Sequence, residues 1–207
     1  MTAEPRRVAV LGGTFDPVHA GHIALIIAVR DALGTDEAWL MPARSPALRD
    51  EPVAPAQLRL AMLETAVRNI PGVRVLDTEL RRPGTSYTFD TLTALASAHR
   101  GVEPWWILGA DAARHVGEWY RSAELRDSLH LVVVQRAGTP LFDDAEARGL
   151  GLAAARTIVL DITPPAVSAS EVRRRVAQGK SIAGMVPGAV ADIIAASGLY
   201  RSVPAVQ

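Results

Sequence analysis

The sequence predicts an α/β fold: a Rossmann-like, doubly wound, mostly parallel sheet with helices on both faces. Short apolar runs rich in β-branched residues alternate with longer stretches whose apolar residues recur at helical spacing. Strands that alternate with helices form right-handed βαβ units, which make neighbouring strands parallel. Turn formers, hydroxyls, histidines and arginines gather just after the strands and are almost absent from them. This asymmetry predicts a binding site at one edge of the sheet.

Six short apolar runs predict the strands. Each is a continuous stretch of four residues, as expected for strands that helices cover on both faces. Trp39, Trp105 and Trp106 fall inside these runs and are predicted core residues. In chain order the predicted strands are Val8–Leu11, Ala38–Met41, Val73–Leu76, Trp105–Leu108, Leu131–Val134 and Thr157–Leu160.

Five stretches with helical spacing predict the helices. Three of them connect successive strands, and two follow the last strand. In chain order the predicted helices are Ile23–Leu33, Gln57–Asn69, Thr88–His99, about Ala169–Gln178 and about Ala189–Ser197. The 207 residues predict a single domain over 1–207, with its core at about 8–200 and a C-terminal helical segment from about 168.

Composition excludes several classes of function. The 22 basic and 22 acidic side chains leave no cationic surplus for a general nucleic-acid binder. Cysteine is absent, which excludes disulfides and a thiolate nucleophile. No apolar run reaches the roughly 18–20 residues of a membrane span. We therefore expect a cytoplasmic protein whose cationic groups gather at one sheet edge if its ligands are anions.

The loop after the first strand is the most informative segment. Gly12 and Gly13 let the backbone approach a ligand closely, because neither residue has a Cβ. His19 and His22 begin the following helix on one face, where N–H groups and two imidazoles suit a phosphate. One alternative is structural: the histidines only cap the helix. Another is a pair of metal ligands, although no third His, Asp or Glu ligand is evident nearby.

Gly12–His22, with the sequence GGTFDPVHAGH, resembles the signature of the HxGH-type nucleotidyltransferase superfamily. Three later segments, in the same order, resemble motifs of the nicotinate-mononucleotide adenylyltransferase family. They are Ser86–Leu92 (SYTFDTL), Gly109–Asp111 followed by Trp119, and Val167–Arg173 (VSASEVR). The resemblance covers about Val8 to Tyr200 and implies adenylyl transfer from ATP to nicotinate mononucleotide.

The resemblance also implies roles for matched residues. His19, His22 and Arg173 are the expected catalytic residues, and the two histidines contact the ATP phosphates. ATP is expected to bind at Gly12, Gly13, Thr14, Phe15, His19, His22, Ser168 and Arg173. The mononucleotide is expected to bind at Tyr87, Thr88, Asp111, Trp119 and Arg136. Magnesium with ATP is the expected cofactor, and no metal ligand is assigned to the protein.

Several residues have structural alternatives. Ser168 and Glu171 spell a capping box, so capping alone explains Ser168 equally well. Trp119 reads as a core aromatic when the resemblance is set aside. Asp16 precedes Pro17, and a turn explains it as well as catalysis does. The segment Pro42–Arg49 lacks the His-Lys pair of many family members, so Arg44 or Arg49 must replace that lysine if anything does.

Three questions of function stay open at this level. The nearest alternative is the same chemistry with nicotinamide mononucleotide or phosphopantetheine as the acceptor, although Ser86–Thr88 argues against the latter. A regulator that binds nucleotide without turnover is the alternative from another class, supported only by the altered Pro42–Arg49 segment. The sequence is compatible with a monomer or a homodimer.

Overall fold

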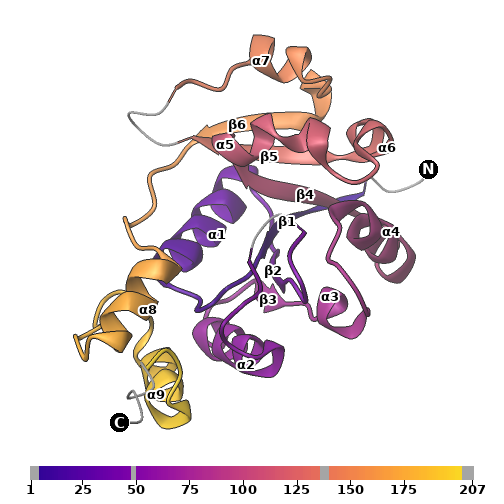
Figure 1. Ribbon diagram of the computed structural model, residues 1–207. Coiled ribbons are helices and arrows are strands. Elements are labelled where there is room, and N and C mark those ends of the chain that lie inside the picture. The colour runs from indigo at the N-terminus through magenta and orange to yellow at the C-terminus, as the bar shows by residue number, and fades with distance from the viewer. Residues whose placement is uncertain (1–4, 48–49, 136–139, 202–207) are drawn as a thin grey trace.

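The computed structural model describes residues 5–47, 50–135 and 140–201 and contains one parallel sheet of six strands. The strand order is β3-β2-β1-β4-β5-β6, so the chain begins in the middle of the sheet and fills first one side and then the other (Figure 1). This is the doubly wound order of dinucleotide-binding folds. The strands are β1 (Arg6–Gly13), β2 (Ala38–Pro42), β3 (Val73–Val75), β4 (Val102–Gly109), β5 (His130–Gln135) and β6 (Thr157–Asp161).

All six predicted strands and all five predicted helices are present. The helices are α1 (Ala20–Leu33), α2 (Ala56–Val67), α4 (Thr88–Ala98), α8 (Ala169–Ala177) and α9 (Gly188–Ser197). Short helices that the sequence analysis did not predict connect the remaining elements. They are α3 (Thr78–Arg81), α5 (Ala110–Arg114), η1 (Val116–Glu118), α6 (Ser122–Ser128), α7 (Asp144–Gly149) and η2 (Ala154–Arg156).

The sheet separates two hydrophobic clusters, because alternate residues of a strand point to opposite faces. In β1, Ala9 and Leu11 belong to one cluster and Val8 and Val10 to the other. Helices α1, α2, α8 and α9 contribute buried residues to the first cluster, and α4, α5 and α6 contribute to the second. The predicted covering of both faces is therefore confirmed. Trp39, Trp105 and Trp106 are buried, as predicted.

Strands β1 and β4 part at their carboxyl ends, and all of their residues are described. Their pairing ends at Val10 and Trp106. Beyond that point β1 continues against β2 as far as Gly13, and β4 continues against β5 as far as Gly109. Chain connections leave in opposite directions from this pair of strands, so it is the switch point where doubly wound sheets bind ligands.

Among the helices of the described residues, none combines the length and apolar character that crossing a bilayer requires. The longest segment of regular helix, α1, has 14 residues.

Candidate active site

The two glycines that end β1 are closely packed, just before the loop that leads to α1. A Cβ on Gly12 would lie 2.7 Å from Cζ2 of Trp106, and one on Gly13 would lie 3.1 Å from Cζ of Phe15. Phe15 itself adopts a φ of 50°, which is uncommon for a bulky residue. This turn seats its buried ring beside Gly13. The strained backbone and the missing side chains together hold the loop close to the end of the strand.

The two predicted catalytic histidines stack on each other where α1 begins. His19 is the N-cap residue of the helix and His22 is its third residue. Their ring centroids lie 3.6 Å apart with an interplanar angle of 24°, and the backbone N–H of His19 donates to Nδ1 of His22 at 3.3 Å. The ring of Phe15 meets His22 edge-on at 4.9 Å. Both imidazoles therefore lie at the positive end of a 14-residue helix, as predicted.

The glycine between these histidines lets a distant segment reach the site. A Cβ on Gly21 would lie 3.1 Å from the His19 ring and also 3.1 Å from the backbone oxygen of Pro165. Pro165 belongs to the connection between β6 and α8. The third residue of the H-x-G-H pattern is therefore glycine for a packing reason: the connection that leads to α8 passes directly over it.

Helix α8 brings Ser168 and Arg173 to the same edge of the sheet. The Ser168 hydroxyl caps the helix by accepting from the N–H of Glu171 at 3.2 Å. Ser168 therefore caps the helix, as the capping box predicts, and its exposed hydroxyl stays a predicted phosphate contact. Nη1 of Arg173 donates to the backbone oxygen of Asp16 at 2.6 Å. Arg173 thus lies against the loop that carries the histidines.

Two buried charged residues support the loop after β1: Asp16 lies in the loop itself, and Arg59 lies in α2. Neither role was predicted from the sequence. The Asp16 carboxylate is 4% exposed and accepts from the N–H groups of Val53 and Ala54 at 2.7 and 3.0 Å. Arg59 of α2 is 1% exposed and donates to the carbonyl oxygens of Thr14, Ala43, Ala54 and Arg44. Burial lowers the pKa of Arg59, and the negative charge of Asp16 opposes that shift.

The residues predicted to bind the mononucleotide lie on segments that end at the same edge. Tyr87 precedes α4, Thr88 begins that helix, and the Tyr87 ring lies 4.5 Å from the ring of Tyr120. The hydroxyl of Ser86 accepts from the N–H of Arg44 at 3.0 Å, which ties this segment to the loop after β2. The guanidinium of Arg44 donates to the backbone oxygen of Leu80. In this structure it is therefore directed at the protein's own backbone.

A buried carboxyl supports the segment that carries Tyr87. Glu79 is 5% exposed and accepts from the Thr91 hydroxyl at 2.6 Å, and the same hydroxyl contacts the backbone oxygen of Tyr87. Burial raises the pKa of Glu79, while hydrogen bonds from Thr91 and Ser86 and the charge of Arg82 oppose this rise. Glu79 thus holds the beginning of α4 from below.

The remaining predicted residues follow β4. The Asp111 side chain is 89% exposed and pairs with Arg114 at 3.3 Å. Trp119 directly follows η1 and is half-buried at the edge of the second hydrophobic cluster. Its core-aromatic and ligand-facing interpretations are therefore both compatible with its place. Arg136 and Arg49 lie outside the described residues.

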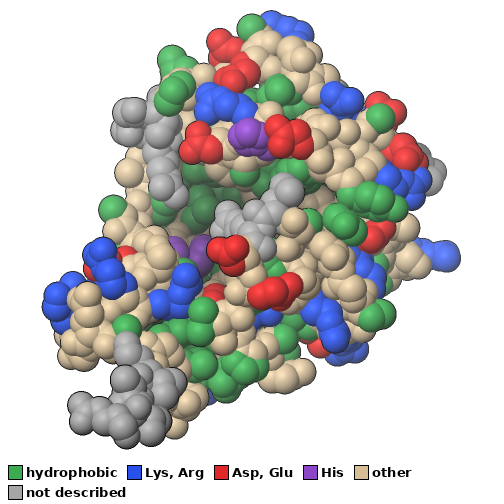
Figure 2. All heavy atoms as spheres, in the orientation of Figure 1, with side chains coloured by type: hydrophobic (Ala, Val, Ile, Leu, Met, Phe, Trp, Pro, Cys, Tyr) green, Lys and Arg blue, Asp and Glu red, His purple; other side chains and the backbone are tan. Residues whose placement is uncertain are grey.

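The face seen in Figure 2 is hollowed near its centre, with hydrophobic side chains on the floor of the hollow and histidine atoms beside it. Acidic and basic side chains occur on both sides of this hollow (Figure 2). On this face the charges are therefore interspersed, and the expected gathering of cationic groups is not seen. The groups predicted to bind phosphate lie in two places: His19 and His22 lie where α1 begins, and Arg173 of α8 contacts the backbone of the loop before α1.

Comparison with known proteins agrees with this geometry. Residues 10–175 match the cytidylyltransferase-like family. A protein of Bordetella avium named "Probable nicotinate-nucleotide adenylyltransferase" is 40% identical over 197 residues, which cover 95% of this chain and 98% of the relative. A protein of the same name from Symbiobacterium thermophilum is 39% identical over 201 residues, covering 94% of this chain and 95% of the relative.

Solved structures extend the likeness to the fold. The nicotinic acid mononucleotide adenylyltransferase of Plasmodium falciparum, complexed with NaAD, superposes with a TM-score of 0.76 at 16% identity. The superposition covers 94% of this chain and 97% of that one. From the matched motifs, the sheet order and the identity to these relatives, it follows that the chain belongs to the nicotinate-nucleotide adenylyltransferase family of cytidylyltransferase-like proteins.

Proposed function

We propose that this protein transfers the adenylyl group of ATP to nicotinate mononucleotide, which yields nicotinate adenine dinucleotide and pyrophosphate. The observation that carries the proposal is the stacked pair His19 and His22 at the beginning of α1, beside the switch point of the sheet. The names of the relatives support the acceptor. The Plasmodium falciparum enzyme has been solved with NaAD and with APC, which supports the same pair of nucleotide ligands here.

The reaction needs positioned charge rather than a protein nucleophile. A phosphate oxygen of the mononucleotide attacks the α-phosphorus of ATP, and the bond to the bridging oxygen breaks as pyrophosphate leaves. The protein must align two anions and stabilise the charge that spreads over the phosphorus oxygens. His19, His22 and Arg173 offer N–H donors for this purpose. Ser168 and the N–H groups that begin α8 can receive the distal phosphates.

The acceptor half of the site is the second part of the proposal. Tyr87 and Thr88 would hold the nicotinate end, Trp119 would lie against the pyridine ring, and Asp111 would bind ribose hydroxyls. The exposed carboxylate of Asp111 and the half-buried ring of Trp119 suit these tasks. Arg136, which is proposed for the phosphate side, lies outside the described residues.

Magnesium would enter this site with ATP. In the described part of the chain, no group of three or more His, Asp or Glu side chains is placed to hold a metal ion. The donor set of imidazoles and a guanidinium suits phosphates, and Mg²⁺ is commonly held by substrate phosphates, water and few carboxylates. The residues therefore fit a metal that the triphosphate carries. When bound, it would neutralise part of the phosphate charge.

The deciding experiment measures pyrophosphate release by the purified protein with ATP and Mg²⁺. Nicotinate mononucleotide, nicotinamide mononucleotide and phosphopantetheine are compared as acceptors at equal concentration. We expect the highest kcat/KM with nicotinate mononucleotide. A higher value with nicotinamide mononucleotide would change the acceptor and keep the reaction. ATP binding by calorimetry without pyrophosphate from any acceptor would contradict the enzymatic function and identify a nucleotide-binding regulator.

Compartment and assembly complete the proposal. We place the reaction in the cytoplasm, because both substrates are phosphorylated metabolites that cells keep there. A homodimer is the assembly to test, and light scattering at the concentration of the activity assay distinguishes one copy from two.

A further inference from the structure

Three segments that are distant in the sequence meet the buried carboxylate of Asp16; they contain Val53 and Ala54, Arg173, and Tyr200. Beyond the N–H groups of Val53 and Ala54, one oxygen also accepts from the hydroxyl of Tyr200 at 2.7 Å. Tyr200 follows α9 and lies 184 residues later in the chain than Asp16. Three donors thus fix the orientation of one carboxylate in the loop between β1 and α1, which also carries His19.

Asp16 also contacts Arg173, through a hydrogen bond to its backbone oxygen and through the charge of its carboxylate. Its backbone oxygen accepts from Nη1 of Arg173 at 2.6 Å, and its carboxylate lies 3.9 Å from the same nitrogen. The Arg173 side chain is 33% exposed and borders an open cavity of about 370 Å³, whose other lining residues are Val53, Arg174, Ala177, Tyr200 and Arg201. Packing alone leaves this side chain room to move. Its position therefore depends on the polar contacts with Asp16.

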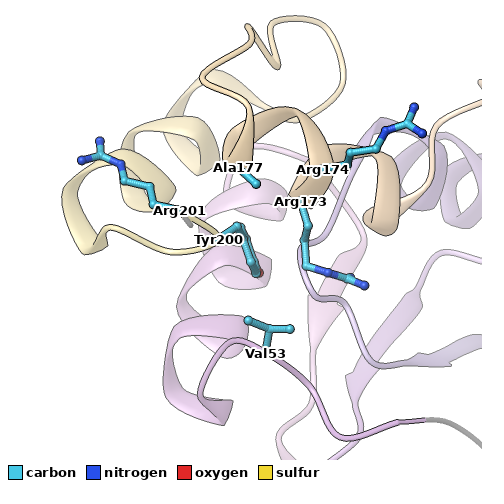
Figure 3. Close-up of a pocket in the computed structure, with 6 residues that line it drawn as sticks. All are labelled: Val53, Arg173, Arg174, Ala177, Tyr200 and Arg201. Atoms are coloured by element: carbon cyan, nitrogen blue, oxygen red, sulfur yellow. The ribbon is translucent and has the colours of Figure 1, made fainter. Parts of the chain in front are cut away.

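Tyr200 is held so that its hydroxyl can serve as a lasting donor. The residue is 8% exposed and belongs to the hydrophobic cluster that also contains Val172 of α8. Figure 3 shows its ring projecting between Val53 and α8, beside Arg173, whereas Arg174 and Arg201 extend away from it. Burial and the hydrogen bond to Asp16 raise the pKa of Tyr200, so the phenol stays protonated.

We propose that Tyr200 is a positioning residue for Arg173: its hydroxyl orients Asp16, and Asp16 holds the guanidinium where the triphosphate of ATP binds. The inference rests on the proposed function only in taking Arg173 as a phosphate contact. Tyr200 touches no substrate in this arrangement. It acts through Asp16, and its effect is confined to the ATP half of the site.

The test is Tyr200→Phe, which keeps the ring and removes the donor. Calorimetry with α,β-methylene-ATP measures binding without turnover. We expect its Kd to rise about fivefold to tenfold, as the loss of one hydrogen bond acting through a charged group predicts. The KM for nicotinate mononucleotide should stay within about twofold. Equal losses for both ligands would indicate general loosening and overturn the proposal.

A double-mutant cycle separates action through Arg173 from direct action. In an Arg173→Ala background, adding Tyr200→Phe should change the Kd for α,β-methylene-ATP no further. If the fold-changes in Kd of the two single variants multiply in the double variant, Tyr200 acts independently of Arg173, which would overturn the inference. Leu199→Ala is the matched control, because it removes a neighbouring aliphatic side chain from the same cluster. It should lower the melting temperature and leave that Kd unchanged; an equal weakening would assign the effect to packing.

Asp16→Asn provides a second route if Tyr200→Phe does not fold. This substitution keeps the shape and one acceptor oxygen but removes the charge beside Arg173, and it should weaken α,β-methylene-ATP binding selectively. The wild-type protein distinguishes failure of the proposed function from failure of the positioning role. Without pyrophosphate release by wild type the proposed function fails. If the wild type is active and Tyr200→Phe binds α,β-methylene-ATP with an unchanged Kd, the proposed function stands and only the positioning role is contradicted.

Discussion

His22 is the side chain on which turnover should depend most directly. Its ring stacks on His19 at the positive end of α1, where a developing negative charge would meet it. We expect His22→Ala to lower kcat by roughly 10²–10³, the usual cost of one lost transition-state donor. Circular dichroism should show an unchanged fold. His115→Ala is the control, because this exposed histidine pairs only locally with Glu118 among the contacts described; equal loss in both variants would contradict the assignment.

Glu79 should make stability depend on pH. Burial raises its pKa in the folded protein above the ordinary 4.5, so the folded state holds the proton more tightly than the unfolded state. The free energy of unfolding should therefore fall as pH rises above about 4.5, until the folded pKa is passed. Glu79→Gln keeps an acceptor for Thr91 and removes the titration.

Urea unfolding of wild type and Glu79→Gln at pH 4 and pH 8 checks this expectation. The variant should gain stability relative to wild type at the higher pH. A difference between the two proteins that is independent of pH would show that Glu79 titrates alike in both states.

Single residues also mark the limit of sequence reasoning. His19 and His22 were found because their spacing on a helix places them together whatever surrounds them. The burial of Arg59 could have been predicted from its spacing. It lies three and four residues before the buried Met62 and Leu63, on the apolar side of α2. The contact of Tyr200 could not be predicted in this way, because its partner Asp16 lies 184 residues away and only folding brings the two together.

At the scale of elements, substitutions of Ser168 at the beginning of α8 can distinguish helix capping from phosphate binding. Ser168→Ala should cost about 1 kcal/mol, because the N–H of Glu171 loses its acceptor. Ser168→Asp restores a capping oxygen but places a negative charge where the triphosphate is proposed to lie. We expect wild-type stability together with a KM for ATP raised about tenfold or more. An unchanged KM in Ser168→Asp would leave Ser168 with capping alone.

Element length explains which helices were predictable. The five predicted helices span 9 to 14 residues, enough for the apolar spacing to repeat. Helices α3 and α5 have four and five residues, so the pattern cannot recur within them. The strands were found because burial on both faces makes them apolar runs. Their ends shifted by a few residues, since hydrogen bonding continues into less apolar sequence, as in β4.

The whole molecule should unfold as one unit. Helices α8 and α9 contribute Val172 and Val190 to the cluster that contains Ala9 of the central strand. The C-terminal helical segment therefore has no separate core. We expect thermal melting followed by tryptophan fluorescence, which reports the buried Trp39, to coincide with melting followed by far-ultraviolet circular dichroism. Two distinct midpoints would divide the predicted domain of residues 1–207.

The Asp16–Tyr200 contact has a consequence for synthesis, because it joins two segments that are translated far apart in time. The loop that carries Asp16 and His19 is translated before Tyr200, whose hydroxyl donates to the Asp16 carboxylate from a position 184 residues later in the chain. Strand β1 likewise waits for β4 before it has neighbours on both sides. A nascent chain therefore carries both histidines before Tyr200 can orient Asp16, and the proposed ATP site is completed only after Tyr200 has been translated.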